Sequence, residues 1–284
     1  MADSGCGATA APGGSPAAEC PLDRPVRIRQ RRRHGCPRRR PRRLFRTGPF
    51  ASVAPVFVGG SSAMILELKG FLTPPEIARL TQLGQELHFV NGRISNPNNL
   101  TKDNLQADAS DPRTAESTRI VADAFARSQP FRDFAFPKRV APPLLARYEA
   151  GMKYGAHADS AYLMVEDAPL RSDISATVFI ADPATYQGGE LVMHVGTHPV
   201  VAKGAPGDVI VYPSTMLHEV RPVRAGTRLV AITFIESLIP DEQQRNDLYE
   251  LSEVAALEGL KMDWRSRVRL DVVRNNLLRR WSRS

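Results

Sequence analysis

Residues 207–236 read GDVIVYPSTMLHEVRPVRAGTRLVAITFIE, and this stretch decides the fold class. Three segments within it, DVIVYP, LHEVRPV and RLVAITFIE, have the length and the β-branched content of strands. Short clusters such as VRAGTR separate them and contain the residues that turns require. The stretch therefore predicts successive antiparallel strands joined by tight connections.

The same pattern extends upstream of this stretch. Further strand candidates are LLARYE (144–149), SATVFIA (175–181), ELVMHV (190–195) and HPVVAK (198–203), with turn clusters such as DPATYQGG and KGAPGD between them. Many short strands with regular Gly and Pro breaks are typical of sandwiches and barrels, a set that includes jelly rolls. We therefore expect a mainly β, α+β protein.

Helical patterns lie on both sides of the strand region. The segment MILELKGFL (64–72) predicts a strand, and the helix after it has Thr73 and Glu76 as a capping box and runs to about His88. A second helix is expected over 114–128, whereas 91–108 and 130–139 read as loops. The helical period returns after Pro240. We expect a main domain over 64–238 and a C-terminal helical module over 239–284.

The positive net charge is concentrated in the first 63 residues. They contain twelve arginines, no lysine and three acidic residues, which leaves 26 basic and 27 acidic residues for the rest. The tract RIRQRRRHGCPRRRPRRLFR (27–46) could be an arm for nucleic acid or a membrane surface, or a targeting peptide. We favour a third interpretation, in which 1–63 is a disordered or mis-called extension, because Met64 opens a natural-looking start.

The cysteine pattern restricts the chemistry of the remaining chain. All three cysteines (Cys6, Cys20 and Cys36) lie in the first segment, so the body cannot have disulfides or a cysteine metal site. No apolar run reaches eighteen residues, the length of a membrane-spanning helix. We expect a cytoplasmic protein whose globular part binds neither membrane nor nucleic acid.

A histidine and an aspartate stand two residues apart in RYEAGMKYGAHADSAYL (147–163). In an extended segment His157 and Asp159 project from the same face, so they are either a polar pair at the surface or two metal ligands. His218 supplies a third candidate, and two histidines with one carboxylate suit a non-haem Fe(II) site. Arg228 follows ten residues later, and a guanidinium is the preferred bidentate partner of a carboxylate such as that of a keto-acid.

Two other histidines, His194 and His198, bracket the turn HVGTH and have the spacing of a zinc-binding pair. They have neither a helix between them nor a nearby third ligand. We interpret them as surface residues of a hairpin.

These motifs together resemble a known family. HAD, YQGGEL and GDVIVYPSTMLHEVRPVRAGTR are similar to the Fe(II)/2-oxoglutarate-dependent dioxygenases related to prolyl 4-hydroxylase. The segments RYEAGMKYGAHAD, RSDISATVFIADPATYQGGELV and NNLLRRWS narrow the resemblance to the bacterial PKHD-type hydroxylases. Their Lys-x-Asn-x-Gln stretch is matched at Lys102, Asn104 and Gln106. The resemblance covers roughly Met64 to Ser284.

The resemblance implies a double-stranded β-helix (jelly-roll) core with N-terminal helices and a C-terminal helical unit. It implies His157, Asp159 and His218 as catalytic iron ligands and Arg228 as the 2-oxoglutarate-binding residue. Tyr148 is either a hydroxyl donor near the co-substrate or a core tyrosine. The implied cofactors are Fe(2+), 2-oxoglutarate as co-substrate and L-ascorbate.

The implied reaction hydroxylates an unidentified substrate with O2 and releases succinate and CO2. The alternative is a non-catalytic jelly-roll protein that binds a metal or acts as a sensor. Arg228 favours the enzyme, because a protein that only holds a metal has no need of a carboxylate receptor. The sequence leaves the oligomeric state open, and a homo-oligomer is one candidate.

Overall fold

The computed structural model describes residues 65–97 and 99–283, so the prediction for residues 1–63 lies outside the described part. The largest sheet has eight strands. They are β1 (Leu66–Leu68), β2 (Phe89–Asn91), β4 (Leu105–Ala107), β5 (Pro137–Val140), β6 (Leu144–Tyr148), β10 (Ile174–Phe179), β14 (Val209–Pro213) and β17 (Arg228–Ser237). Their order is β1-β14-β10-β17-β6-β4-β2, and β5 pairs with β17.

A second sheet of five strands has the order β13-β12-β15-β7-β3. Its members are β3 (Lys102–Asp103), β7 (Lys153–His157), β12 (Leu191–Val195), β13 (His198–Ala202) and β15 (His218–Val220). Two small ribbons pair β8 (Tyr162–Val165) with β9 (Ala168–Arg171), and β11 (Gln187–Gly188) with β16 (Val223–Ala225). Every pair that forms the two large sheets is antiparallel.

The eight-stranded sheet is apolar on both faces, which explains the continuous apolar runs of its strands. Successive residues of a strand project to opposite sides. Leu229 therefore packs with the helices, whereas Val230 belongs to the cluster that also contains Leu191 and Met193 of the five-stranded sheet. The two sheets enclose this second cluster between them. The result is the predicted double-stranded β-helix, or jelly roll, with helices beside it.

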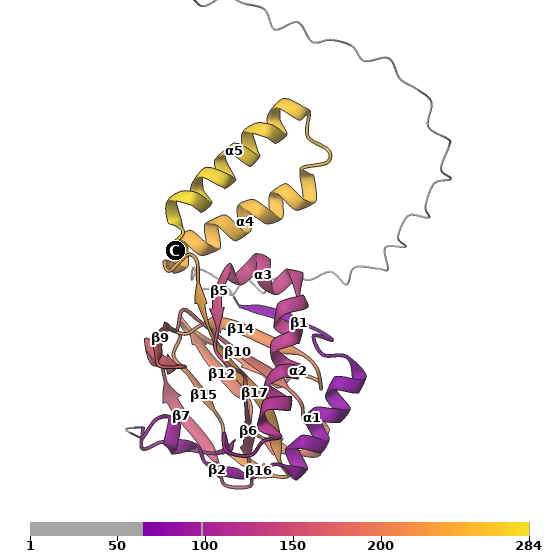
Figure 1. Cartoon of the computed structure of the whole chain (residues 1–284), viewed down its shortest axis with the longest axis vertical. Helices are drawn as coiled ribbons and strands as arrows, with labels where there is room; N and C mark the ends of the chain where they lie inside the picture. The colour runs from indigo at the N-terminus through magenta and orange to yellow at the C-terminus, as the bar shows by residue number, and fades with distance from the viewer. Residues whose placement is uncertain (1–64, 98, 284) are drawn as a thin grey trace, which may run out of the picture. The chain divides into compact units, whose positions relative to one another are not determined.

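Helices α1 (Pro74–Glu86), α2 (Thr114–Arg127) and α3 (Gln129–Ala135) pack on the outer face of the large sheet (Figure 1). Phe125 of α2 is almost fully buried, and its ring centre lies 4.7 Å from that of Phe71 and 4.8 Å from that of Phe131. The predicted capping pair is present, since Glu76 accepts hydrogen bonds from the backbone N–H and the hydroxyl of Thr73. The first helix ends at Glu86, two residues before the predicted end.

The C-terminal region forms the two expected helices, α4 (Glu242–Glu258) and α5 (Trp264–Trp281), which contact each other. Asp241 and Asp263 start them, because each carboxylate accepts backbone N–H groups of the first turn. Among the residues that the structure describes, no helix has the length and apolar character needed to cross a membrane.

Two predicted loops contain regular structure. Residues 91–108 include the short strands β3 and β4 and the 3-10 helix η1 (Gly92–Ser95). Outside these two loops, a second 3-10 helix, η2, spans Pro183–Thr185. The prediction of a loop over 130–139 was wrong, since helix α3 and strand β5 occupy that range. The hydroxyl of Ser128 accepts the N–H of Phe131 at the start of α3, and burial of Phe131 and Phe134 stabilises this short helix.

Candidate active site

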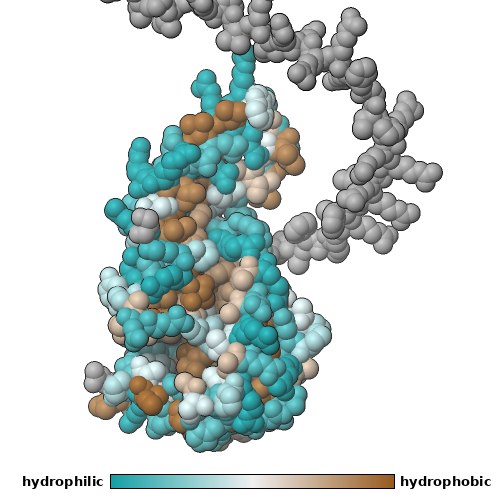
Figure 2. Space-filling model, in the orientation of Figure 1, coloured by the Kyte–Doolittle hydropathy of each residue, from teal (hydrophilic) through white to brown (hydrophobic). Residues whose placement is uncertain are grey.

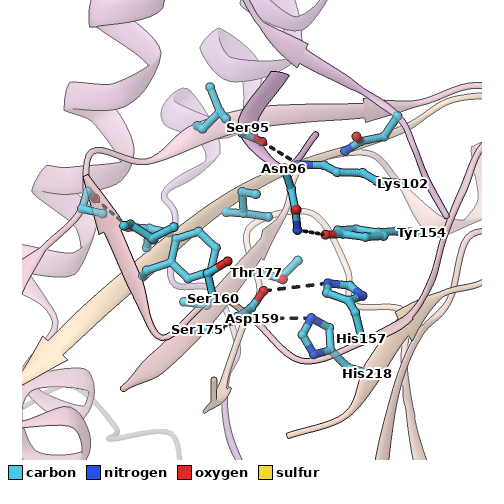
Figure 3. Close-up of a pocket in the computed structure, with 18 of the residues that line it drawn as sticks. Ser95, Asn96, Lys102, Tyr154, His157, Asp159, Ser160, Ser175, Thr177 and His218 are labelled. Atoms are coloured by element: carbon cyan, nitrogen blue, oxygen red, sulfur yellow. Dashed lines mark hydrogen bonds and ion pairs between the residues drawn. The ribbon is translucent and has the colours of Figure 1, made fainter. Parts of the chain in front are cut away.

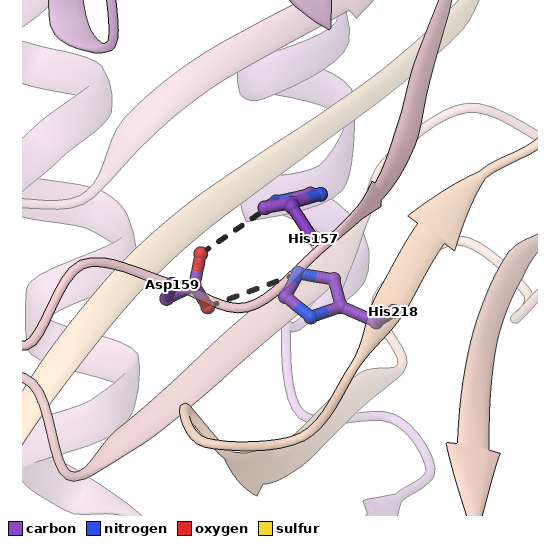
Figure 4. Close-up of side chains that lie close together, drawn as sticks. All are labelled: His157, Asp159 and His218. Atoms are coloured by element: carbon purple, nitrogen blue, oxygen red, sulfur yellow. Dashed lines mark ion pairs between the residues drawn. The ribbon is translucent and has the colours of Figure 1, made fainter. Parts of the chain in front are cut away.

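Strand pairing brings two of the predicted ligands together. Strands β7 and β15 are antiparallel neighbours, and in their register His157 stands opposite His218. Asp159 follows β7, where its backbone N–H donates to the carbonyl of Ser214 at 3.2 Å. The three side chains therefore converge, although the second histidine is 61 positions after the first along the chain (Figure 4).

The three side chains form a compact donor set. Their ligand atoms lie within 4.8 Å of one another, the one arrangement of this kind among the described residues. The carboxylate oxygens of Asp159 are 3.8 Å from Nε2 of His157 and 3.8 Å from Nε2 of His218. These distances are too long for hydrogen bonds, and a metal ion with bonds of about 2 Å fits between such donors.

Hydrogen bonds behind the imidazoles orient them toward this centre. Nδ1 of His157 lies 2.8 Å from the carbonyl of Gly155, and Nδ1 of His218 lies 2.9 Å from the carbonyl of Met216. A carbonyl only accepts, so Nδ1 carries the proton and Nε2 presents its lone pair to the centre. Burial, together with the nearby His218, lowers the pKa of His157 and favours the neutral form that a metal requires.

A chain of serine hydroxyls holds the aspartate. Ser175 Oγ donates to Oδ2 of Asp159 at 2.6 Å and lies 2.7 Å from Oγ of Ser214, which in turn lies 2.8 Å from Oγ of Ser172. The sequence prediction did not include these residues. Ser175 was visible only as a polar residue at the start of an apolar strand. This series of three serine hydroxyls fixes the carboxylate of Asp159, in the way that outer hydrogen-bond partners fix metal ligands.

Arg228 begins β17 and stands opposite Tyr148 of β6. Its side chain is only 1% exposed, its guanidinium lies 4.9 Å from the centre of the Tyr148 ring, and its Nε and Nη2 have no hydrogen-bond partner. Two buried N–H groups without partners are costly unless an acceptor arrives. Gly189 leaves space for this side chain, since a Cβ there would lie 3.0 Å from Cδ of Arg228.

All five predicted site residues line one pocket of about 410 Å³ between the two sheets. Tyr148 is buried, and burial raises its pKa, so the hydroxyl keeps its proton. The pocket is also lined by Ser95, Asn96, Lys102, Tyr154, Ser175 and Thr177, which Figure 3 labels. By contrast, His194 and His198 lie exposed on the β12–β13 hairpin, as the surface interpretation predicted.

The donor chemistry of this pocket matches a particular class of enzyme. Two imidazole nitrogens with one carboxylate suit Fe(II), and a buried guanidinium suits a dicarboxylic co-substrate. The model of the 2OG-Fe(II) oxygenase superfamily matches residues 143–236, which include the three ligand candidates and Arg228.

Curated relatives define the family more closely. A PKHD-type hydroxylase of Sphingopyxis alaskensis is 53% identical over 196 residues, which cover 69% of this chain and 89% of the relative. PKHD-type hydroxylases of Xanthomonas campestris pv. campestris and Thermosynechococcus vestitus are each 36% identical and are matched over 99% of their lengths and 77% of this chain. The chain belongs to the PKHD-type hydroxylase family and is an Fe(II)- and 2-oxoglutarate-dependent dioxygenase.

Proposed function

We propose that the pocket between the two sheets couples the oxidative decarboxylation of 2-oxoglutarate to the hydroxylation of a substrate C–H bond. One oxygen atom of O2 enters succinate and the other enters the hydroxylated product, and CO2 is released. His157, Asp159 and His218 would hold the iron, which supplies the O2 and redox chemistry when it is bound. The observation that carries this proposal is the convergence of the three donors in the same pocket as a buried guanidinium whose Nε and Nη2 have no partner.

The remaining residues would bind and orient the reactants. Arg228 would hold the distal carboxylate of 2-oxoglutarate through its two free N–H groups, and Tyr148 would pack beside it and present its hydroxyl. The apolar wall formed by Leu191, Val220 and Ile232 would exclude water from the reacting centre. These roles support an enzyme over the alternative of a non-catalytic metal-binding sensor, which would not need Arg228.

The experiment that tests this function is succinate formation by the full chain with Fe(II), 2-oxoglutarate and O2. Candidate peptides and small metabolites are added one at a time, with and without ascorbate. We expect Fe(II)-dependent succinate release that a true substrate stimulates, and stoichiometric hydroxylated product. We propose ascorbate as a reductant that keeps the iron in the Fe(II) state, so omitting it should shorten the linear phase. Failure to form succinate with any metal or substrate would support the sensor.

We also propose that residues 64–238 form the dioxygenase domain and 239–284 a separate helical module. The division is supported by the packing of α4 and α5 against each other and by the absence of buried residues in α5, while Tyr249 of α4 anchors the module on Phe134 of α3. Cytoplasmic localisation is likewise a proposal, to be tested by cell fractionation with an antibody against the native protein.

We infer that the helical module pairs with a second copy of the chain. Helix α5 contains no buried residue, and Leu257, Leu260, Trp264 and Val272 are exposed (Figure 2 shows hydrophobic patches on the molecular surface). Helix α4 has five acidic residues and one arginine, and α5 has six arginines and one aspartate. A two-fold axis that places α4 of one copy against α5 of the other would cover the apolar residues and match the charges.

A further inference from the structure

The pocket contains a second buried cation that the iron site and Arg228 do not explain. Lys102 is only 6% exposed, and its ammonium donates to Oγ of Ser95 at 2.6 Å. It also lies 5.4 Å from the centre of the Tyr154 ring. None of the ion pairs found in residues 65–97 and 99–283 includes Lys102. Its ammonium therefore contacts a hydroxyl and an aromatic ring, and the negative charge of Asp159 acts on it without an ion pair.

The path of the backbone brings Lys102 into the same pocket as the candidate iron ligands. Lys102 pairs with Tyr154 of β7, while Leu105 pairs with Arg147 of β6, so the chain crosses from the small sheet to the large one between these points. Lys102 and Asn104 are both buried and line the pocket, whereas Asp103 between them is exposed. The ring of Tyr154 is stacked on that of His157, with centres 3.6 Å apart, and separates the lysine from the ligands (Figure 3).

The charges that line the pocket do not balance. The buried ones are Lys102, Arg228 and Asp159; Glu166 also lines the pocket but is exposed at the β8–β9 turn. Fe(II) adds two positive charges, and the 2-oxoglutarate dianion adds two negative ones. One positive charge then remains without a counter-ion in a site of low dielectric, where an unpaired charge is expensive. Burial lowers the pKa of Lys102, although the negative charge of Asp159 acts in the opposite direction.

The position of Lys102 favours the substrate over the co-substrate as the source of that anion. Arg228 starts a central strand deep in the molecule, and its own free N–H groups match one carboxylate. Lys102 instead donates to Ser95 of η1, and Ile94 of the same short helix and Leu100, two residues before the lysine, are 71% and 78% exposed. The segment that contributes Ser95 to the pocket wall thus also reaches the molecular surface, which makes Lys102 the better placed of the two cations for a substrate that arrives from solvent.

We propose that Lys102 is the receptor for a carboxylate of the hydroxylated substrate, so that the substrate is an acid. The proposal rests on the proposed function, because the charge balance assumes Fe(II) and 2-oxoglutarate in the pocket. In this arrangement Arg228 and Lys102 hold two different carboxylates, one of the co-substrate and one of the substrate. Because Lys102 fixes the carboxylate of the substrate, the substrate C–H bond that reacts is held in one orientation in the pocket.

The test is a binding experiment on the full chain loaded with Zn(II), a metal without redox chemistry, and saturated with 2-oxoglutarate. Matched acids and amides are titrated by calorimetry: propionate against propionamide, and N-acetylglycine against N-acetylglycinamide. We expect the wild type to bind each acid about tenfold or more tightly than its amide, as a charge-assisted hydrogen bond would give. Lys102→Met should remove this preference, and Lys102→Arg should retain most of it.

A matched control distinguishes the effect of the Lys102 charge inside the pocket from the effect of lowering the net charge of the protein. Lys153 lies on β7 opposite Asp103 but is exposed and does not line the pocket, so Lys153→Met should leave the acid preference unchanged. The Zn(II) content and circular dichroism of each variant establish that it is folded. Should Lys102→Met fail to fold, the comparison of acids with amides in the wild type and in Lys102→Arg still tests whether Lys102 is the carboxylate receptor.

Three results would overturn the proposal. Equal binding of acids and amides by the wild type, or no binding of either, would contradict the role of Lys102 as a carboxylate receptor. A loss of 2-oxoglutarate affinity in Lys102→Met as large as in Arg228→Met would assign the lysine to the co-substrate instead. Failure of the wild type to bind 2-oxoglutarate at all would contradict the proposed function itself, so the two failures are distinguishable.

Discussion

At the scale of single residues, the hydrogen bonds behind His157 and His218 determine what the site can bind. Each Nδ1 faces a backbone carbonyl, so each Nε2 is free to coordinate. Asp159 adds one negative charge, which offsets part of the charge of a divalent ion. In the proposed site each of the three side chains would therefore supply a metal bond that the other two could not replace.

Replacing any one of the triad, as in His157→Ala, Asp159→Ala or His218→Ala, should abolish iron-dependent conversion of 2-oxoglutarate to succinate. The cause is the loss of a direct ligand, so the iron content of the purified protein should fall as well. His194→Ala is the matched control, because this histidine is exposed on the β12–β13 hairpin. A triad variant with full turnover would contradict the assignment of these ligands.

Arg228→Ala should raise the 2-oxoglutarate concentration needed for half-maximal turnover much more than the iron concentration. The loss of a charged bidentate contact costs on the order of 2–4 kcal/mol, or roughly 30- to 1000-fold in affinity. Arg224→Ala, on an exposed position of β16, should behave like the wild type. Equal changes in the two requirements would indicate a general loss of structure, which the thermal midpoint would reveal.

Ser175→Ala should weaken metal binding while leaving the three ligands in place. The hydroxyl donates to Oδ2 of Asp159, and removal of such an outer partner typically costs about 10- to 100-fold in metal affinity. Competition with a chelator measures the affinity, and Ser175→Thr should restore part of it. An unchanged affinity would mean that Ser214 and the backbone suffice to hold the carboxylate.

The ligand candidates could be predicted from sequence because their side-chain types and local spacing are distinctive. His157 and Asp159 alternate within one segment, and His218 and Arg228 follow turn signals that locate strand starts. Ser175 and Ser214 could not be predicted, because their roles depend on contacts between distant strands. Serine is also common in strands and turns, so its presence alone indicates no partner.

At the scale of elements, local signals predicted the long apolar strands and most of the helices, whereas several short or partly polar strands, among them β7, were not predicted. The strand β17 and the helix α2 lie within one residue of their predicted bounds. The short strands β3 and β4 were missed because the polar composition of 91–108 is also that of a loop. Pairing with β7 and β6 makes these segments strands, and pairing is a tertiary effect that overrides local propensity.

Phe125→Ala should lower the free energy of unfolding by about 3–5 kcal/mol, because the ring fills the space between α2 and the large sheet. Denaturant titration with a constant slope measures this loss. The iron affinity of the folded fraction should not change, since Phe125 does not line the pocket. Phe136→Ala, at a less buried position, should cost less.

At the scale of the whole molecule, the inferred pairing of helical modules makes a prediction about mass. Light scattering after size-exclusion chromatography should give a dimer for the wild type and a monomer for the double variant Leu260→Glu/Trp264→Glu. These two side chains are 96% and 78% exposed, so the fold does not need them. Leu100→Glu, equally exposed but far along the chain, is the control. A monomeric wild type would contradict the inferred pairing.

The opposition of His157 and His218 across β7 and β15 has a consequence for work with the purified protein. A slip of one residue between these strands would turn one imidazole to the other face of the sheet and destroy the donor set. With the proposed ligands, only correctly registered molecules would therefore take up iron. The molar ratio of tightly bound metal to protein then becomes a direct count of the native fraction in any preparation.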